Sequence, residues 1–502
     1  MAKNPKRSNT AVIVLLTLLI IVMIAATGLM IWLCIDLVNK PAQPGSSSPG
    51  TLQSQPAETT PPTETQTVPP TTTEPEPVPE HVVSTATIGS MGDLLMHEPL
   101  FKQNYNSVSY LGNNEYDFTP MFEYLAEYAS IPDLAVANLE TTLCSTDNGY
   151  GYSGYPHFNC PDEIVDGAKD AGFDMLLTGN NHSYDTTLVG YKRTLEVIRE
   201  KELGTLGTML SADEPKYVIQ DINGIKIGMI SYTYANYDTE DGRPSLNGNA
   251  PIAEAGICNY FVTGKPAAFY TEIEGYLQEM EDAGAEATVV YMHWGVEYNT
   301  FANNEQKTIA QKLCDLGVDV IIGGHPHVVQ PVDLLESTVD PDHKTVIIYS
   351  MGNAVSNQRL GNLSAISTAH TEDGVMFSIT FEKYSDGTVY LAGADVLPTW
   401  VNKFTNSDGK LEYNILPLDD DRRDSWKDMF DIGDNTFNAC VKSYDRTMAI
   451  VGEGLEECRA WLEQQKLDRE EYYYNLAFFP EMFATEAAEP ETTPTETLAN
   501  AA

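Results

Sequence analysis

The chain has 502 residues, which is enough for a large catalytic domain with additional segments. Its 72 acidic and 29 basic residues give a formal net charge of −43. So acidic a surface repels phosphate backbones and argues against nucleic acid as a partner. It also repels a polyanionic substrate, unless a bound cation reverses the local field.

The first predicted element is a membrane anchor. Residues 1–10 carry three basic side chains, and an uncharged apolar run, long enough to cross a bilayer, follows from Ala11 to Ile35. No Lys or Arg occurs over 41–101. The positive-inside bias therefore predicts a cytoplasmic N-terminus at 1–10, a single-pass signal anchor over 11–38 and an extracellular main domain. A cleaved signal peptide is the alternative, but its apolar region is usually shorter and ends at a small-residue cleavage site.

Two segments have a composition that does not support folding. Residues 41–80 are rich in Pro, Thr, Ser, Gln and Glu, and such a segment cannot bury enough apolar surface to fold. We expect an extended, disordered stalk over 41–80, which holds the domain away from the membrane. Residues 485–502 have a similar composition and are expected to form a disordered tail.

From 81 to 400, apolar runs alternate with amphipathic stretches, which predicts a layered α/β domain. Strands are expected at Ser84–Ser90, Leu134–Asn138, Met175–Thr178, Lys226–Ser231, Thr288–Met292, Val318–Ile322 and Thr345–Ser350. Helices are expected near Pro120–Ser130, Pro161–Ala171, Leu188–Lys201, Pro266–Ala283 and Asn304–Leu316. The runs Val375–Glu382 and Thr388–Val396 lie closer together and predict antiparallel strands. Residues 401–484 are predicted to form a C-terminal extension, which is partly helical.

Six cysteines follow the predicted anchor. Cys144 and Cys160 bracket a loop rich in Gly and Tyr, and Cys440 and Cys458 lie in the C-terminal extension. Each pair could form a disulfide in an oxidising exterior, and buried free thiols are the equally weighted alternative. Because the chain has no Cys-x-x-Cys motif, a thiolate zinc site is disfavoured.

Polar residues of metal-ligand type follow several of the predicted strands. They are Asp93, Asn138, Glu140, Asn180, Asn181, His182, His293, His325 and His327. Because an open α/β sheet gathers side chains at the carboxyl ends of its strands, these distant segments predict one shared site. Carboxylate, amide and imidazole groups suit a divalent ion such as Zn, Mn or Fe. Such a set can hold two ions with a carboxylate between them.

Local geometry adds to the prediction for His325 and His327. Alternate residues of a strand point the same way, so these two side chains are expected to share a direction. Gly324, just before them, allows the backbone to approach an ion closely.

Four residues are candidates for substrate binding, namely Asn138, Asn180, Glu297 and Asn353, of which the first two also belong to the strand-end set. For Glu297, an ordinary structural role is favoured over substrate binding. An ordinary role is also favoured for His97 and His157.

Six motifs resemble, in order, those of CapA-type capsule-synthesis proteins, the poly-γ-glutamate synthesis family also called PgsA. They are Gly-Asp at 92–93, Ala-Asn-Leu-Glu at 137–140, Gly-Asn-Asn-His at 179–182, His-Trp-Gly-x-Glu-Tyr at 293–298, Gly-His-Pro-His-Val at 324–328 and Ser-x-Gly-Asn at 350–353. The resemblance covers about Ser84 to Val396. That family is itself similar to the calcineurin-like metallophosphoesterases, so the resemblance implies an αββα sandwich with a two-metal site.

The resemblance also implies roles for individual residues. His182 matches the catalytic histidine, and the metal ligands are Asp93, Glu140, Asn181, His293, His325 and His327. The chain departs from the related pattern at two positions: Leu95 stands where an Asp-x-His motif would have its histidine, and Glu140 replaces a bridging aspartate. One tight ion and one weak ion are therefore expected.

A role in making or exporting poly-γ-glutamate capsule is the function that the resemblance implies. The partners would be the cytoplasmic membrane and the capsule synthase and export subunits, and the substrate a polyanionic polymer or a phosphoester. We expect a metal-dependent hydrolase or transferase that uses one or two divalent ions. A non-catalytic polymer-binding or assembly subunit and a general extracellular metallophosphoesterase are the alternatives.

Overall fold

The computed structural model describes residues 78–362 and 367–482. The predicted anchor over 11–38, the stalk up to residue 77 and the tail over 485–502 lie outside these ranges. Among the described residues, no helix combines the length and the apolar character that crossing a membrane requires.

One large sheet in the described part of the chain has eight strands. Seven follow the order β19-β18-β17-β1-β4-β5-β6, and β16 (Asn353–Val355) pairs with β1. Parallel pairing joins four of them, β1 (Val82–Leu94), β4 (Leu134–Leu139), β5 (Met175–Leu177) and β6 (Gly204–Leu206). Antiparallel pairing adds β17 (Asp373–Tyr384), β18 (Val389–Thr405) and β19 (Leu411–Pro417).

A second sheet of the described residues has seven strands. Six follow the order β11-β8-β12-β13-β15-β14, and β7 (Val218–Ile222) pairs with β8. Its parallel strands are β11 (Tyr260–Val262), β8 (Ile225–Ala235), β12 (Ala287–His293), β13 (Val320–Gly324) and β15 (Lys344–Ile348). The edge strand β14 (Val332–Glu336) is antiparallel to β15.

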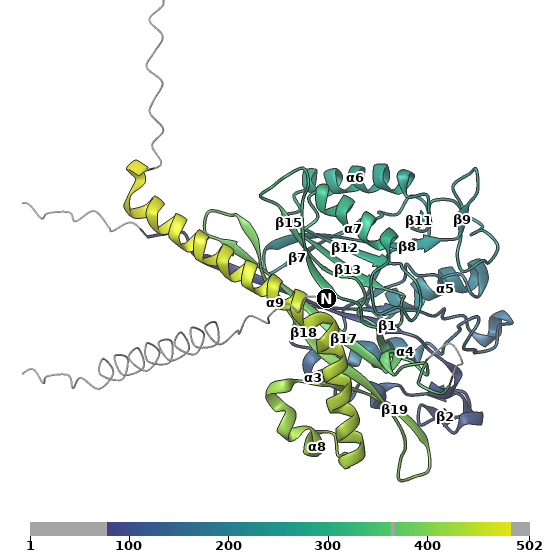
Figure 1. The fold of residues 1–502 in the computed structure, drawn as a ribbon. Coiled ribbons are helices and arrows are strands. Elements are labelled where there is room, and N and C mark those ends of the chain that lie inside the picture. The colour runs from purple at the N-terminus through teal and green to yellow at the C-terminus, as the bar shows by residue number, and fades with distance from the viewer. Residues whose placement is uncertain (1–77, 363–366, 483–502) are drawn as a thin grey trace, which may run out of the picture. The chain divides into compact units, whose positions relative to one another are not determined.

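The two sheets pack face to face and helices cover their outer faces. Ile88 and Val136 of the first sheet and Met229 and Val289 of the second belong to one buried apolar cluster. The outer face of the first sheet shares a cluster with α2 (Thr119–Phe122), α3 (Ala126–Ala129), α4 (Glu163–Asp170) and α5 (Thr187–Glu200). The second sheet is covered by α6 (Ala267–Asp282) and α7 (Asn304–Asp315) (Figure 1). The predicted layered α/β fold is therefore confirmed.

Shorter elements connect these layers. The small strands are β2 (Tyr110–Gly112), β3 (Glu115–Tyr116), β9 (Tyr237–Asp238) and β10 (Pro244–Ser245). The 3-10 turns are η1 (Glu98–Leu100), η2 (Gln103–Tyr105), η3 (Thr146–Asn148), η4 (His370–Glu372), η5 (Asp420–Ser425) and η6 (Pro480–Met482).

The C-terminal region completes the first sheet and also adds two helices to the sandwich. The first sheet continues past residue 400, because β18 runs through that position and pairs with β19. Helical structure follows in α8 (Trp426–Met429) and in α9 (Asp434–Phe478), which crosses β18 and β14 (Figure 1). Val451, Leu455 and Leu462 of α9 join the cluster between the sheets, so this helix closes one side of the core.

All six cysteines of the described residues are buried free thiols. Of the two alternatives left open by the sequence, the structure therefore has the thiols rather than the disulfides. Cys440 and Cys458 lie in the single helix α9, 18 residues apart. At 1.5 Å per residue their Cα atoms are about 27 Å apart, far beyond the reach of a disulfide.

Candidate metal centre

The predicted ligands meet at the carboxyl ends of the parallel strands. Asp93 and Asn138 lie in the last residues of β1 and β4, and His293 ends β12. The side chains of this site are buried, with none more than 4% exposed: Asp93, Asn138, Glu140, Asn180, Asn181, His182, His293, His325, His327 and Asn353. Both sheets thus contribute to one site at a common edge.

Two groups of donors are suitable for a metal ion, and both contain Glu140. The first group is Glu140, His293 and His325, and the second is Asp93, Glu140 and His327. Within each group the ligand atoms lie within 4.8 Å of one another. Glu140 Oε1 is 3.5 Å from His293 Nε2, while Oε2 is 3.8 Å from His327 Nδ1. Each carboxylate oxygen therefore faces a different group, as a bridging ligand would.

Three unpartnered atoms show that the donors fit a cation. Both oxygens of Glu140 and Nδ1 of His325 are buried and have no hydrogen-bond partner. A buried polar group without a partner costs about 1–3 kcal/mol, and more when it is charged. A divalent ion between them would satisfy these atoms, and the oxygen and nitrogen donors suit Zn, Mn or Fe.

The first group is completed by an amide and an aromatic ring. Asn181 Oδ1 lies 2.7 Å from His293 Nε2, so Asn181 is placed to join this group. Tyr234, near the end of β8, packs against both histidines, with its ring centroid 6.4 Å from that of His293 and 4.8 Å from that of His325. The sequence analysis missed Tyr234, because an aromatic residue in an apolar strand is more often part of a core.

The second group contains an internal pair. Asp93 Oδ2 lies 3.0 Å from His327 Nδ1, and Asn138 Nδ2 donates to Asp93 Oδ1 at 2.8 Å. Asn353 Oδ1 is 3.1 Å from the same His327 nitrogen. Asn180 Nδ2 in turn donates to Asn138 Oδ1 at 3.1 Å. These contacts make Asn138, Asn180 and Asn353 positioning residues, and their contact with a substrate stays a prediction.

The pKa values of the histidines differ between the two donor groups. Burial lowers the pKa of His293 to about 3 and that of His325 well below its ordinary value. Burial alone would raise the pKa of Asp93 and lower that of His327, but their mutual hydrogen bond and opposite charges, together with smaller effects of neighbouring groups, outweigh it. The pKa of Asp93 is therefore lowered and that of His327 raised, as expected of an ion pair. Burial, followed by the charge of Asp93, raises the pKa of Glu140 well above its ordinary value.

The His-Pro-His segment does not continue the strand before it. β13 ends at Gly324, and His325 and His327 have φ angles of 95° and 56°. Such left-handed backbone is uncommon outside glycine and clusters at functional sites. The expectation that strand alternation aims both histidines the same way is therefore wrong, because the turn directs them to different donor groups. The close backbone approach does occur, since a Cβ on Gly324 would lie 3.2 Å from Asp93 Oδ1.

His182 stands beside the donors with a carboxylate behind it. Its Nε2 is 4.0 Å from Glu140 Oε1, and its Nδ1 is 2.7 Å from Asp185 Oδ2. Asp185 is buried and also accepts the backbone N–H of Phe158 at 2.7 Å. Because Asp185 engages Nδ1, it directs Nε2 towards the metal ligands. The sequence analysis missed Asp185, although its position three residues after the histidine in a turn was a usable signal.

The remaining candidates lie around this centre. Glu297 is exposed, yet its charge helps to raise the pKa of Glu140, after burial and Asp93, and that of His327, where burial acts in the opposite direction and Asp93 contributes more than Glu297. His157 is exposed, with Nδ1 3.8 Å from Asp185 Oδ1. His97 is partly buried, and its Nδ1 lies 3.2 Å from the carbonyl oxygen of Leu95.

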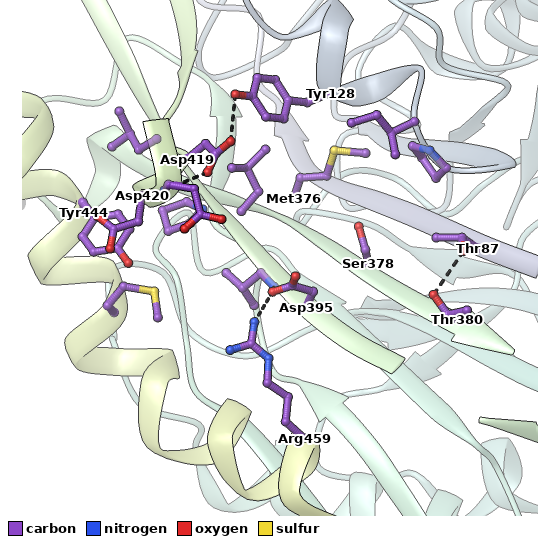
Figure 2. Close-up of a pocket in the computed structure, with 18 residues that line it drawn as sticks. Thr87, Tyr128, Met376, Ser378, Thr380, Asp395, Asp419, Asp420, Tyr444 and Arg459 are labelled. Atoms are coloured by element: carbon purple, nitrogen blue, oxygen red, sulfur yellow. Dashed lines mark hydrogen bonds and ion pairs between the residues drawn. The ribbon is translucent and has the colours of Figure 1, made fainter. Parts of the chain in front are cut away.

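A cavity that is separate from the metal centre lies on the first sheet. It has a volume of about 670 Å³, and residues of β17, β18 and α9 line much of it. Figure 2 shows Arg459 of α9 pairing with Asp395 of β18 at this cavity. None of the predicted site residues lines this cavity, so it is not part of the metal centre.

Comparisons with known proteins point to one family. A sequence model described as "Bacterial capsule synthesis protein PGA_cap" matches residues 87–358. The "PGA biosynthesis protein CapA" of Bacillus subtilis (strain 168) is 25% identical over 311 residues, which are 61% of this chain and 73% of that protein. The "Capsule biosynthesis protein CapA" of Bacillus anthracis is 26% identical over 252 residues, which are 49% of this chain and 56% of that protein.

Among solved structures, "Structure of Haemophilus influenzae NAD nucleotidase (NadN)" is similar with a TM-score of 0.37 and 13% sequence identity. The alignment covers 73% of this chain and 60% of that chain. This likeness is too weak to bear on activity.

Proposed function

Because the chain belongs to the bacterial capsule synthesis family PGA_cap, we propose that it is a metal-dependent hydrolase or transferase of capsule biosynthesis. The family match covers more than half of the chain, and the predicted resemblance to CapA-type proteins is thereby confirmed. The observation that carries the catalytic proposal is Glu140, a buried carboxylate without hydrogen-bond partners between two groups of metal-type donors.

The donors divide into two positions that share Glu140. Asn181, His293 and His325 would hold one ion, and Asp93 and His327 a second. Ions held by these residues would supply an activated water and positive charge for a phosphoryl or acyl centre. Face-to-face sheets with outer helices and ligands at the strand ends support a metallophosphoesterase-like fold for this domain.

His182 is the proposed general acid. Its Nε2 faces the donors, where it can give a proton to the leaving group. Asp185 holds the ring through Nδ1 and stabilises the charged imidazole before the proton moves. The pair is buried, which strengthens the interaction between the carboxylate and the imidazole.

The proposed location is the outer face of the cell membrane. An anchor over 11–38 would place the domain of residues 81–400, and the C-terminal residues that complete its sheet, outside the cell. There it could meet an emerging poly-γ-glutamate chain, or a phosphoester, together with synthase and export subunits. The acidic charge of the chain disfavours such substrates unless cations at the site offset it.

The test uses the full-length chain purified in detergent. Metal content is measured first, followed by hydrolysis of an aryl phosphate, of nucleotides and of poly-γ-glutamate by the wild type and by His182→Ala. Retained metal with turnover lost in His182→Ala supports the enzyme. Bound metal with no turnover, or with turnover unchanged by His182→Ala, rejects it and leaves a polymer-binding or assembly subunit. Fast nucleotide hydrolysis without action on the polymer would instead indicate a general metallophosphoesterase.

A second variant separates positioning from metal binding. In Asp185→Asn, the imidazole loses the carboxylate that orients it while every metal ligand remains. We expect kcat to fall about 10–100-fold with metal content unchanged, as for other partners that orient a catalytic or ligating histidine. A loss of metal in this variant would contradict the assignment of Asp185 to the acid.

A further inference from the structure

A short strip of chain, from Asn353 to Asn357, leads away from the metal centre through β16, with the buried apolar residues Ala354 and Val355 between its polar ends. The strand begins at Asn353, whose Oδ1 lies 3.1 Å from His327 Nδ1. Asn357 follows four residues later, and its backbone N–H lies 3.4 Å from His97 Nδ1. Four residues of extended chain span at most about 14 Å. The Cα atoms of Asn353 and Asn357 are therefore no more than about 14 Å apart, a span that a short oligomer can cover.

Lys403 lies at the outer end of this strip. Its Nζ donates to Asn357 Oδ1 at 2.8 Å and stands 5.4 Å from the centre of the Tyr413 ring. The hydroxyl of Tyr413 donates to the same Asn357 oxygen at 2.7 Å. Uncharged groups thus fix the position of the ammonium, and no carboxylate of residues 78–362 or 367–482 lies within 4.0 Å of it.

The surroundings of Lys403 leave its charge unbalanced. Arg359 is close enough to affect it, but the Arg359 guanidinium already pairs with Glu372 at 2.6 Å. Partial burial lowers the pKa of Lys403, and the Arg359 charge lowers it further. Both effects disfavour the ammonium, and a bound anion would relieve both. An unbalanced cation is notable in a chain whose net charge is −43.

Strand direction places Lys403 at the same edge as the metal ligands. β17 is antiparallel to β1, and β18 is antiparallel to β17. The carboxyl end of β18 therefore lies at the edge where β1 ends with Asp93. Lys403 is two residues before the last residue of β18 and pairs with Tyr413 of β19.

We propose that Lys403 binds a second anionic group of an elongated substrate whose reacting group lies at the metal centre. Asn357 and Tyr413 hold the ammonium in place for this contact. The inference rests on the proposed function, and it narrows the substrate to an oligomer with repeated anionic groups. Carboxylates of a γ-linked glutamate chain are the groups to which we assign the subsite, because the family is one of capsule synthesis.

The test measures binding by calorimetry with the full-length chain in the His182→Ala background, where turnover does not consume the ligand. The probes are a γ-linked glutamate oligomer, a polyphosphate of similar length, free glutamate and inorganic phosphate. Lys403→Met keeps the aliphatic stem over Tyr413 and removes the charge. We expect it to weaken oligomer binding about tenfold, the contribution of one hydrogen bond to a charged group. Binding of free glutamate and of phosphate, which are too short to span both positions, should not change.

Two further variants provide the controls. Lys442→Met removes the same charge from an exposed position of α9, and Lys403→Arg retains charge at the subsite. Lys442→Met should bind the oligomer like the parent, and Lys403→Arg should retain most of the affinity. Equal weakening by Lys442→Met, or no weakening by Lys403→Met, overturns the proposal. An effect on polyphosphate without one on the glutamate oligomer overturns the assignment to carboxylates. If binding depends on Lys403 but the wild type has no turnover, the subsite stands and the enzymatic function fails.

Discussion

The two donor groups share Glu140 but differ in how far they satisfy themselves. Around Asp93 and His327, a hydrogen bond and opposite charges already neutralise the ligand atoms. Around His293 and His325, the imidazoles are uncharged, and one of their nitrogens has no partner. His293 and His325 are therefore ready to bind a cation. An ion that binds beside Asp93 must first displace a proton from His327.

The difference explains how one site can hold a tight ion and a weak one. The group of His293 and His325 holds two of the three unpartnered atoms, Glu140 Oε1 and His325 Nδ1, and gains the most from a cation, since binding removes a desolvation cost. The Asp93 group gains less and also has Leu95, a buried residue, where a related pattern would have a histidine. We expect metal to fill the position of His293 and His325 first.

The largest effect is expected from Glu140, because both positions depend on it. Glu140→Gln removes the bridging charge and should abolish binding at both positions, lowering metal affinity by more than about 100-fold. Metal content after dialysis against trace metal would measure this. Glu297→Gln, at an exposed carboxylate near the site, is the matched control and should retain metal. Retention of one ion in Glu140→Gln would show that the two positions do not share this ligand.

The next effect distinguishes the positions from each other. His325→Ala should empty the tight position and lower its affinity about 100-fold, whereas Asp93→Asn should affect only the weak one. Titration of the metal-free chain, followed by calorimetry, would resolve the two steps. The same loss in both variants would mean that the ions bind as a coupled pair.

A gain of binding is expected from Leu95→His. Leu95 is buried and lies two residues after Asp93, directly past the end of β1, so a histidine there is placed to add a ligand beside Asp93. A new imidazole ligand should raise the affinity of the weak position about tenfold and leave the tight position unchanged. Calorimetry of Leu95→His beside Leu95→Phe, which adds bulk without a ligand, provides the measurement and its control.

The smallest expected effect is a difference in pH dependence. The pKa of His327 is raised above its ordinary value of 6.5, so below that raised value His327 carries a proton that the weak ion must displace. His293, with a pKa of about 3, and His325 require no such release near neutral pH. The affinity of the weak position should therefore rise by up to about tenfold per pH unit as pH rises from 6.5 towards the raised pKa of His327. Calorimetry in buffers of different ionisation enthalpy would count the protons released. An affinity of the weak position that does not change over this pH range would contradict the comparison.

Much of the site could be predicted from local patterns in the sequence. Apolar runs followed by polar residues predicted the ends of β4, β12 and β13 closely, because strand burial and ligand chemistry both leave local signals. Asp185 left a weaker signal, as a carboxylate three residues after His182, and Tyr234 left none, since it joins the site only through contact with distant residues. The turn at His325 and His327 was also hidden, because left-handed backbone is uncommon at any non-glycine residue.

By itself, the sequence determined the α/β class, the strand ends that carry ligands and the donor types, since these depend on periodicity and side-chain chemistry. Tertiary structure alone decided that Glu140 serves two donor groups, that α9 closes the core and that Lys403 shares an edge with Asp93. Such relations join residues tens to hundreds of positions apart. They arise from the packing of two sheets, which no local pattern encodes.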